Sequence, residues 1–243
     1  MFARAQVVSG DLKARASLDA ACEGIDVVIT TATAASRGGD DTPETVDWLR
    51  HQNLIDAATR AGVKQFIFVS ANFAALESPI PIAAAKFKAE TYLRASGLNY
   101  TILAPTAFME GWPERVVGLS VSNGRPVTLI GNARGKISFI ARSDVAAYAS
   151  ASISHPAALN QRLVIGGPEA LSYRDVVVVY ERVLGYPIPI HFANPDEDIL
   201  DLPPIVVAML AKDEDEIVDS RECASVFGIT PTRLEDFLRL EKG

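Results

Sequence analysis

Short apolar runs alternate with longer stretches of helical periodicity over the first 105 residues. The runs at 25–29, 66–70 and 100–105 are each short enough to form one buried strand. The segments 44–61 and 86–96 predict helices, and each is followed by a glycine that can end a helix. Strands that alternate with helices in this way need crossover connections. The pattern therefore predicts an α/β fold around a parallel sheet.

This alternation stops after residue 107. The segment 108–135 is rich in Gly and Pro, and its apolar pieces are short. Beyond it, a helix is predicted to begin at Ser143–Asp144, with Asp144 as its cap, and a strand is predicted at 163–165. A helix that ends at Leu184 is predicted to start at a capping box of Ser172 and Asp175. A terminal helix is predicted to start at a second capping box, of Thr232 and Glu235. We therefore expect a core over 1–107 and a mixed segment over 108–243 that completes the sheet and forms a small substrate-side lobe.

Composition and charge narrow the class of protein. Apolar residues make up 49% and charged residues 22%, which excludes a disordered chain. The apolar stretch 203–211 is half as long as a membrane-spanning helix, and residues 1–6 lack the apolar core of a secretory signal. The 23 basic and 30 acidic side chains give a net charge of −7, whereas nucleic acid or an anionic membrane would require a basic surface. We expect neither as a partner.

The two cysteines, Cys22 and Cys223, lie 201 positions apart. Such a pair does not form a disulfide framework, so the simplest interpretation is free thiols in a reducing, cytoplasmic compartment.

Several motifs occur in the order of one known family. They are Val8-x-Gly10-Asp11-Leu12, the segments 18–28 and 53–64, Phe68-Val69-Ser70-Ala71, and the segments 86–103, 137–146 and 167–173. Together they resemble the NmrA-like family of atypical short-chain dehydrogenases/reductases, and 86–103 is the most specific piece. The resemblance implies a Rossmann-like parallel sheet with helices on both faces, NADP or NAD as cofactor, and a small C-terminal lobe over the nicotinamide.

Members of this family open with a strand, a glycine-rich turn, a helix and a second strand, and the turn holds the diphosphate. No three glycines in this sequence have the G-x-x-G-x-x-G spacing. We therefore expect a truncated chain that lacks the first two strands through a mis-assigned start or fragmentation, rather than a functional natural truncation. Residues 6–8 would then pair beside 25–29, or the sheet edge would stay open.

Lys86 and Ser70 are the catalytic candidates. Short-chain reductases commonly place a tyrosine four residues before a lysine, so that both lie on one helix face. Lys86 matches the family lysine, but Ile82 stands four residues before it, and Tyr92 lies about 120° away around the helix. The tyrosine-dependent mechanism is therefore not supported. Two alternatives stay open: a solvated helix lysine, and a strand-end serine that bonds backbone.

Cofactor contacts are expected beyond the carboxyl ends of the strands, where parallel α/β sheets hold ligands. The resemblance assigns such contacts to Asp11, Leu12, Thr30, Thr31, Ala32, Thr33, Ser70, Lys86, Pro105, Thr106, Ala107 and Phe108. For Asp11, a simple turn residue is the alternative. His51, His155 and His191 have no metal-ligand spacing, so no metal site is expected.

The leading hypothesis is an NAD(P)H-dependent oxidoreductase that transfers a hydride to a small acceptor such as a quinone or an enone, because these accept a hydride without a positioned acid. The alternatives are a non-catalytic NAD(P)-sensing or scaffold protein and an inactive truncated fragment. The substrate, the choice between NADP and NAD, and the oligomeric state are left open by the sequence.

Overall fold

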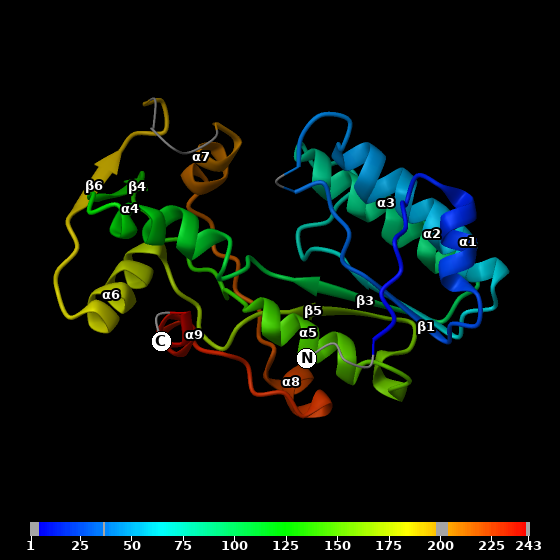
Figure 1. Cartoon of the computed structure of the whole chain (residues 1–243). Coiled ribbons are helices and arrows are strands. Elements are labelled where there is room, and N and C mark those ends of the chain that lie inside the picture. The colour runs from blue at the N-terminus through cyan, green and yellow to red at the C-terminus, as the bar shows by residue number, and fades with distance from the viewer. Residues whose placement is uncertain (1–4, 36, 198–203, 242–243) are drawn as a thin grey trace. The chain divides into compact units, whose positions relative to one another are not determined.

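The computed structural model describes residues 5–35, 37–197 and 204–241 (Figure 1). Within these residues the chain forms two compact units. The first unit consists of the residues up to Ala104 together with 149–163. The second unit consists of residues 105–148 together with the chain from Val164 onward. Each unit is therefore built from two separate stretches of chain.

A four-stranded sheet contains the predicted strands in the order β1-β2-β3-β5. These strands are β1 (Val27–Thr30), β2 (Gln65–Val69), β3 (Tyr100–Pro105) and β5 (Gln161–Ile165). Both β1 and β3 pair with β2 in parallel, with Val27 opposite Gln65 and Phe66 opposite Tyr100. The predicted α/β fold around a parallel sheet is confirmed. The last strand begins two residues earlier than the apolar pattern indicated.

One face of the sheet is covered by helices of the first unit. They are α1 (Arg15–Cys22), η1 (Pro43–Arg50, a π-type segment), α2 (His51–Arg60) and α3 (Pro81–Ala95), and α1, α2 and α3 lie together on one side of the strands in Figure 1. Their shared apolar cluster includes Leu54, Phe68, Leu93 and Ile102. Burying one such side chain contributes about 1.5–3 kcal/mol, so this cluster holds the helices against the strands.

The helix starts follow from local sequence. At the start of η1, the Thr42 hydroxyl accepts from the Thr45 amide while the Thr45 hydroxyl accepts from the Thr42 amide, which is a capping box. The predicted helix over 44–61 corresponds to η1 followed by α2. The predicted start of the next helix at Lys86 was wrong, because α3 begins at Pro81, where the missing proline amide is not needed.

The outer edge of β1 has no strand beside it among the described residues. Residues 5–10 have no regular secondary structure, and Val7 and Val8 are exposed. Of the two expectations for this edge, pairing with residues 6–8 was wrong and the open edge is confirmed. Ile29 on β1 is 43% exposed.

The returning segment 152–158 binds polar groups of β2 and β3. Gln65 Nε2 donates to the Ser152 carbonyl at 2.9 Å and to Thr101 Oγ1 at 3.0 Å, and Thr101 donates to the Ala158 carbonyl at 2.9 Å. Gln65 and Thr101 are both buried. Buried polar groups need such partners, so these bonds fix the return of the chain to the first unit.

The second unit contains a small parallel sheet that the pattern did not predict. Its strands are β4 (Val127–Ile130) and β6 (Ile190–Ala193), with Thr128 opposite His191. The remaining elements of the chain are η2 (Glu114–Gly118), α4 (Leu119–Ser122), α5 (Arg142–Ala151), η3 (Pro156–Ala158), α6 (Tyr173–Leu184), α7 (Pro204–Ala211), α8 (Arg221–Phe227) and α9 (Leu234–Glu241). The core of this unit includes Val117, Phe139 and Tyr180.

The two predicted capping boxes have different outcomes. The box of Ser172 and Asp175 opens α6, so that prediction is confirmed. The box at Thr232 was wrong, because the amide and the hydroxyl of Thr232 both donate to the Asp144 carboxylate at 2.8 Å. Asp144 was expected to cap its own helix, and instead it ties the start of α5 to the segment before α9.

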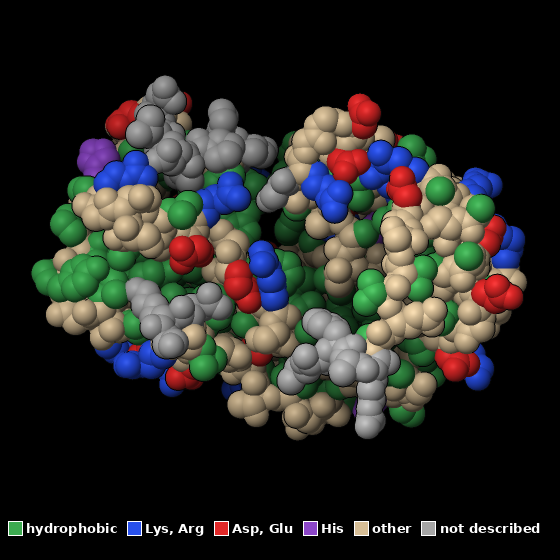
Figure 2. All heavy atoms as spheres, in the orientation of Figure 1, with side chains coloured by type: hydrophobic (Ala, Val, Ile, Leu, Met, Phe, Trp, Pro, Cys, Tyr) green, Lys and Arg blue, Asp and Glu red, His purple; other side chains and the backbone are tan. Residues whose placement is uncertain are grey.

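Apolar side chains reach the surface of the second unit, as the space-filling view shows (Figure 2). Val178, Tyr186, Ile190 and Phe192 are 39–51% exposed. The Arg174 guanidinium lies 4.4 Å from the centroid of the Phe192 ring and shields part of it. No helix in the described ranges is both long and apolar enough to cross a bilayer.

Candidate functional site

The carboxyl ends of β1 and β2 lie side by side in the first unit. Thr30 is the last residue of β1 and lies opposite Phe68, and Ser70 follows the last residue of β2. Ligands of parallel α/β proteins bind at this end of the sheet. Several buried polar side chains gather there, from β1, η1, α2, α3 and the residue that follows β2.

Lys86 of α3 reaches this end of the sheet and is buried. Its Nζ donates to the Val69 carbonyl at 3.2 Å, lies 3.4 Å from Asp47 Oδ1, and lies 5.2 Å from the centroid of the Phe68 ring. Burial lowers the pKa of Lys86, and the Asp47 carboxylate opposes that shift. The alternative of a solvated lysine was wrong, because only 7% of Lys86 is exposed.

Asp47 of η1 connects this lysine to the loop after β1. It has no exposed surface, and its Oδ2 accepts from the Ala34 amide at 2.9 Å while Oδ1 faces Lys86. Sequence reasoning missed Asp47. A signal was present, because Asp47 and His51 are four residues apart on the helix face that also carries Leu54 and Ala58. Polar side chains on an apolar face point to a buried site.

His51 of α2 is neutral and positions the end of β1. Its Nδ1 lies 3.0 Å from the Val46 carbonyl and its Nε2 lies 3.3 Å from Thr30 Oγ1. A carbonyl only accepts, so Nδ1 carries the proton and Nε2 accepts from the Thr30 hydroxyl. Burial lowers the pKa of His51 to about 4. The hydroxyl of Thr30 is therefore engaged inside the protein.

Ser70 belongs to a second buried group beside Lys86. Its hydroxyl donates to Glu90 Oε1 at 2.6 Å, and Arg162 Nε donates to Glu90 Oε2 at 3.0 Å. The alternative of a serine that bonds backbone was wrong, because its hydroxyl donates to a carboxylate. Arg162 also donates to the Ala71 carbonyl at 2.9 Å, which fixes the loop after β2. Ser70 can accept a further hydrogen bond but has no second proton to donate.

The other cofactor candidates of the first unit are less enclosed. Thr31 is exposed, and the Thr33 hydroxyl accepts from the Ala35 amide at 3.2 Å. Asp11 is exposed and accepts from the Lys13 amide at 2.9 Å, which is the turn geometry considered for it, while Leu12 packs against the helix layer. For the remaining candidate, Ala32, the backbone amide donates to Thr30 Oγ1 at 3.4 Å.

Four predicted cofactor contacts, Pro105 to Phe108, lie in the second unit. The Thr106 amide donates to the Ile165 carbonyl at 3.0 Å, and its hydroxyl donates to the Ser138 carbonyl. The Ala107 carbonyl accepts from the Ile140 amide at 3.0 Å, and Phe108 forms a β-bridge with Ile140. The polar groups of this segment are thus largely engaged within their own unit, and its contact with a cofactor stays a prediction.

Neither a metal centre nor a reactive thiol is apparent in the described ranges. No group of three or more His, Cys, Asp or Glu side chains there could hold a metal ion. Cys22 is buried in the apolar layer, Cys223 is partly buried, and both are free. Burial raises the pKa of both thiols, which disfavours the reactive thiolate.

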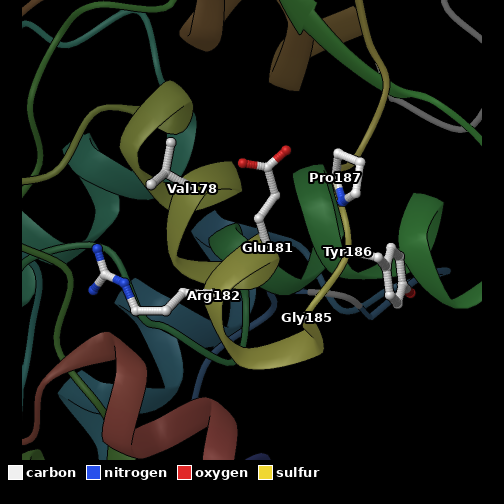
Figure 3. Close-up of a pocket in the computed structure, with 6 residues that line it drawn as sticks. All are labelled: Val178, Glu181, Arg182, Gly185, Tyr186 and Pro187. Carbon is white, nitrogen blue, oxygen red and sulfur yellow. The ribbon is translucent and has the colours of Figure 1, made fainter.

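A shallow hollow in the second unit has a volume of about 400 Å³ (Figure 3). Val178, Glu181 and Arg182 line it from α6, and Tyr186 and Pro187 line it from the segment that follows. Glu181 accepts from the Ile188 amide at 2.8 Å, and Arg182 pairs with Glu235 at 2.8 Å. These charged groups stabilise the local structure, so the hollow adds no chemistry to the site at the strand ends.

A family profile described as NAD(P)H-binding matches residues 2–156. The chain belongs to this NAD(P)H-binding family. The match begins at residue 2, so it gives no support to the expected loss of an opening segment. The expected Rossmann-like character and the expected nicotinamide cofactor agree with the family. The finer NmrA-like assignment finds a counterpart in a relative named as an NmrA-like family domain-containing oxidoreductase from Aspergillus flavus, 25% identical over 151 residues.

Two relatives illustrate the range of this family. The photosystem II assembly factor Ycf39 of Trieres chinensis is 31% identical over 182 residues, which are 74% of this chain and 56% of the relative. An NAD(P)H azoreductase of Xenophilus azovorans is 29% identical over 184 residues, which are 75% of this chain and 60% of the relative. The chain therefore spans less than two thirds of the length of these relatives.

Solved structures share the fold. The NADPH-dependent quinone oxidoreductase QOR2 of Escherichia coli, complexed with NADPH, has a TM-score of 0.76 at 23% identity, over 97% of this chain and 83% of that one. The triphenylmethane reductase of a Citrobacter species, complexed with NADP(H), has a TM-score of 0.75 at 19% identity, over 95% and 81%. At these identities the likeness establishes a Rossmann-like α/β fold.

The described residues fit the sugar part of such a cofactor. One N–H of Lys86 donates to the Val69 carbonyl, and Asp47 Oδ1 pairs with the ammonium at 3.4 Å. An ammonium has three N–H donors, so donors remain for a hydroxyl such as those of a nucleotide ribose. For the diphosphate, the sequence offers no glycine-rich turn of the G-x-x-G-x-x-G kind.

Proposed function

We propose that this chain is the nucleotide-binding part of an NAD(P)H-dependent reductase that passes a hydride to a small acceptor such as a quinone or an enone. The observation that carries the proposal is the buried Lys86, held by Asp47 and Val69 at the carboxyl ends of β1 and β2 in an NAD(P)H-binding family member. A relative named as an azoreductase and a fold shared with a quinone oxidoreductase support the same class of acceptor.

The residues at the strand ends would bind and orient rather than donate a proton. Lys86 binds ribose hydroxyls, and Asp47 keeps its ammonium in place and balances its charge. The Ser70 hydroxyl is directed at Glu90, so it can accept from a ligand but not protonate one. When bound, NADPH or NADH supplies the hydride, and the acceptor takes its proton from water.

A lysine substitution with a matched control tests this proposal. Lys86→Met removes the ribose donor, and we expect NADPH binding, followed by nucleotide fluorescence, to weaken by about tenfold or more. Lys88→Met is the control, because Lys88 lies on the same helix but pairs with Glu44 at the surface. Quinone-dependent oxidation of NADPH should fall with Lys86→Met and not with Lys88→Met. Equal affinities of both variants and the unmodified chain would contradict the proposal, provided that circular dichroism shows that all three are folded.

A second candidate is a protein that binds NAD(P)H without turning it over. One observation favours it: Ile82 occupies the position four residues before Lys86 where reductases of the superfamily commonly carry tyrosine. A relative named as a photosystem II assembly factor shows that the sequence family extends to proteins named for a role other than reduction. Binding of NADPH with no oxidation by any quinone, enone or dye would favour this candidate over the first.

A further inference from the structure

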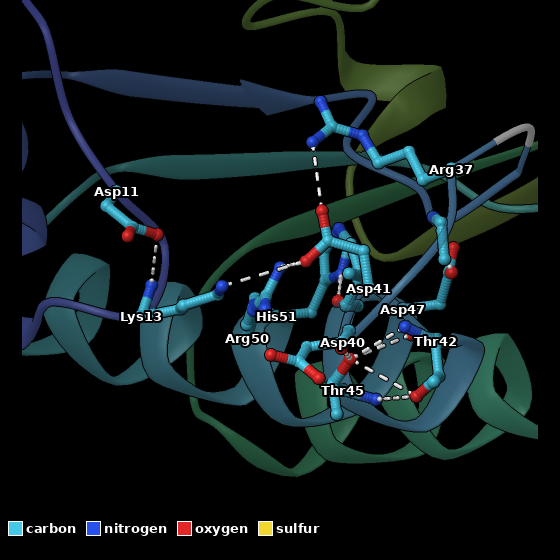
Figure 4. Close-up of polar contacts among 12 residues, drawn as sticks. Asp11, Lys13, Arg37, Asp40, Asp41, Thr42, Thr45, Asp47, Arg50 and His51 are labelled. Carbon is cyan, nitrogen blue, oxygen red and sulfur yellow. Dashed lines mark hydrogen bonds and ion pairs between the residues drawn. The ribbon is translucent and has the colours of Figure 1, made fainter.

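Three cations converge on one carboxylate beside the loop that follows β1. Arg50 lies 2.7 Å from Asp41 Oδ1, Arg37 lies 3.1 Å from Asp41 Oδ2, and Lys13 lies 3.8 Å from Asp41 Oδ1. Lys13 and Arg37 approach the carboxylate from different sides (Figure 4). The three come from separate segments: the turn before α1, the loop after β1, and the end of η1. The fold therefore assembles this cluster.

The cluster has an excess of positive charge. Three cations around one carboxylate leave a formal charge of +2, in a protein whose net charge is −7. Arg50 and Arg37 hold the pKa of Asp41 below its usual range, so the carboxylate is ionised. The Arg50 side chain is only 11% exposed, which reduces screening of its charge by water. A partly enclosed excess of positive charge attracts anions.

Its place in the fold is close to the candidate site. The loop over 31–42 leaves the carboxyl end of β1, and the same loop is fastened to buried Asp47 through the Ala34 amide. Lys13 follows Asp11 and donates its amide to that carboxylate at 2.9 Å. A ligand that lies along the end of β1 would have these cations within reach of its charged groups.

We propose that Lys13, Arg37 and Arg50 form a binding site for the phosphate dianion of a nucleotide, and that Asp41 is an internal anion which the phosphate displaces. Guanidinium groups bind phosphate through paired N–H donors, as they bind a carboxylate. That the phosphate belongs to a nucleotide rests on the proposed function; the anion site does not.

Titration with three probes tests this site, namely NADPH, NADH and inorganic phosphate, measured by calorimetry at low salt. NADPH carries a phosphate monoester that NADH lacks. We expect Arg37→Gln to weaken the binding of NADPH and of inorganic phosphate by about tenfold to a hundredfold. Arg37 is 64% exposed, so this change should leave the fold intact. Asp41→Asn should tighten binding by up to about tenfold, because it removes the internal competitor.

Arg60→Gln is the matched control, because Arg60 pairs with Asp19 at 2.6 Å in the same unit, away from the cluster. It should leave all three affinities unchanged. A preference for NADPH over NADH that Arg37→Gln abolishes would identify the nucleotide as the source of the phosphate. Equal affinities for NADPH and NADH, with binding of inorganic phosphate that Arg37→Gln weakens, would support the site with free phosphate as its ligand.

Two results separate this inference from the proposed function. Binding of NADH and NADPH that neither Arg37→Gln nor Asp41→Asn alters, with no binding of inorganic phosphate, would overturn the anion site and leave the reductase proposal standing. Binding of phosphate that depends on Arg37, without binding of either nucleotide, would overturn the reductase proposal and leave the anion site standing.

Discussion

Asp47→Asn should destabilise the first unit strongly, because it removes the charge opposite a buried lysine. Asp47 has no exposed surface and Lys86 is 7% exposed, so the ammonium would remain in a dry environment without its carboxylate. The amide that replaces the carboxylate can still accept from Ala34. Breaking one side of a buried ion pair costs about 3–5 kcal/mol. At about 2–4 °C per kcal/mol for a chain of this size, the melting temperature should fall by about 6–20 °C.

The effect of Asp47→Asn on stability should depend on pH, and the sign of this dependence follows from the pKa of Lys86. Burial lowers the pKa of folded Lys86 below that of the unfolded chain, and Asp47 limits this shift. Between the two pKa values the unfolded chain binds more protons, so stability rises with pH in that window. Asp47→Asn lowers the pKa of Lys86 further and extends the window downward. The stability deficit of the variant against the unmodified chain should therefore shrink as the pH rises towards 10.5, the ordinary pKa of lysine.

Urea denaturation followed by circular dichroism measures the effect, with two comparison variants. Asp26→Asn breaks a shorter pair, 2.8 Å to Lys64, but both of those side chains are more than 70% exposed, so stability should change little. The double variant Asp47→Leu with Lys86→Met replaces the pair by apolar groups and should lose less stability than Asp47→Asn alone. A loss below about 1 kcal/mol for Asp47→Asn, or a deficit that grows with pH, would refute the reasoning.

Two further predictions concern the helix layer. The pKa of His51 is about 4 in the folded chain and 6.5 in the unfolded chain, so the free energy of unfolding should fall by up to about 3 kcal/mol as the pH falls from 6.5 to 4. The urea midpoint of His51→Gln should lack this pH dependence. The same pH profile in the variant and the unmodified chain would exclude His51 as the cause. Leu93→Ala should cost about 2–5 kcal/mol in chemical denaturation, because Leu93 has no exposed surface, whereas Leu240→Ala, at a position 79% exposed, should cost little; similar losses for both would contradict the packing described.

The strands of the first unit could be predicted because buried strands have short runs of apolar residues in the sequence. The runs at 25–29, 66–70 and 100–105 all became strands of one sheet. The strand β4 could not be predicted, because it lies in a segment rich in Gly and Pro where the apolar pieces are short. Periodicity also misplaced the start of α3, since Ile82 and the three alanines before Lys86 are all apolar and show no helical alternation.

Partners that are distant in the sequence explain most of what was missed at the site. Lys86 was found through a family resemblance, but its neighbour Asp47 lies 39 residues earlier and was overlooked. Asp144 and Thr232 are 88 residues apart, so local capping rules suggested the wrong partner for each. The convergence of Lys13, Arg37 and Arg50 on Asp41 likewise depends on the loop path after β1, which no local pattern determines.

The most direct test of the central claim is a crystal structure of this chain with NADPH. A ribose hydroxyl should lie within about 3 Å of Lys86 Nζ, at the carboxyl ends of β1 and β2. A nucleotide bound elsewhere on the chain, with no contact between its ribose and Lys86, would contradict this prediction.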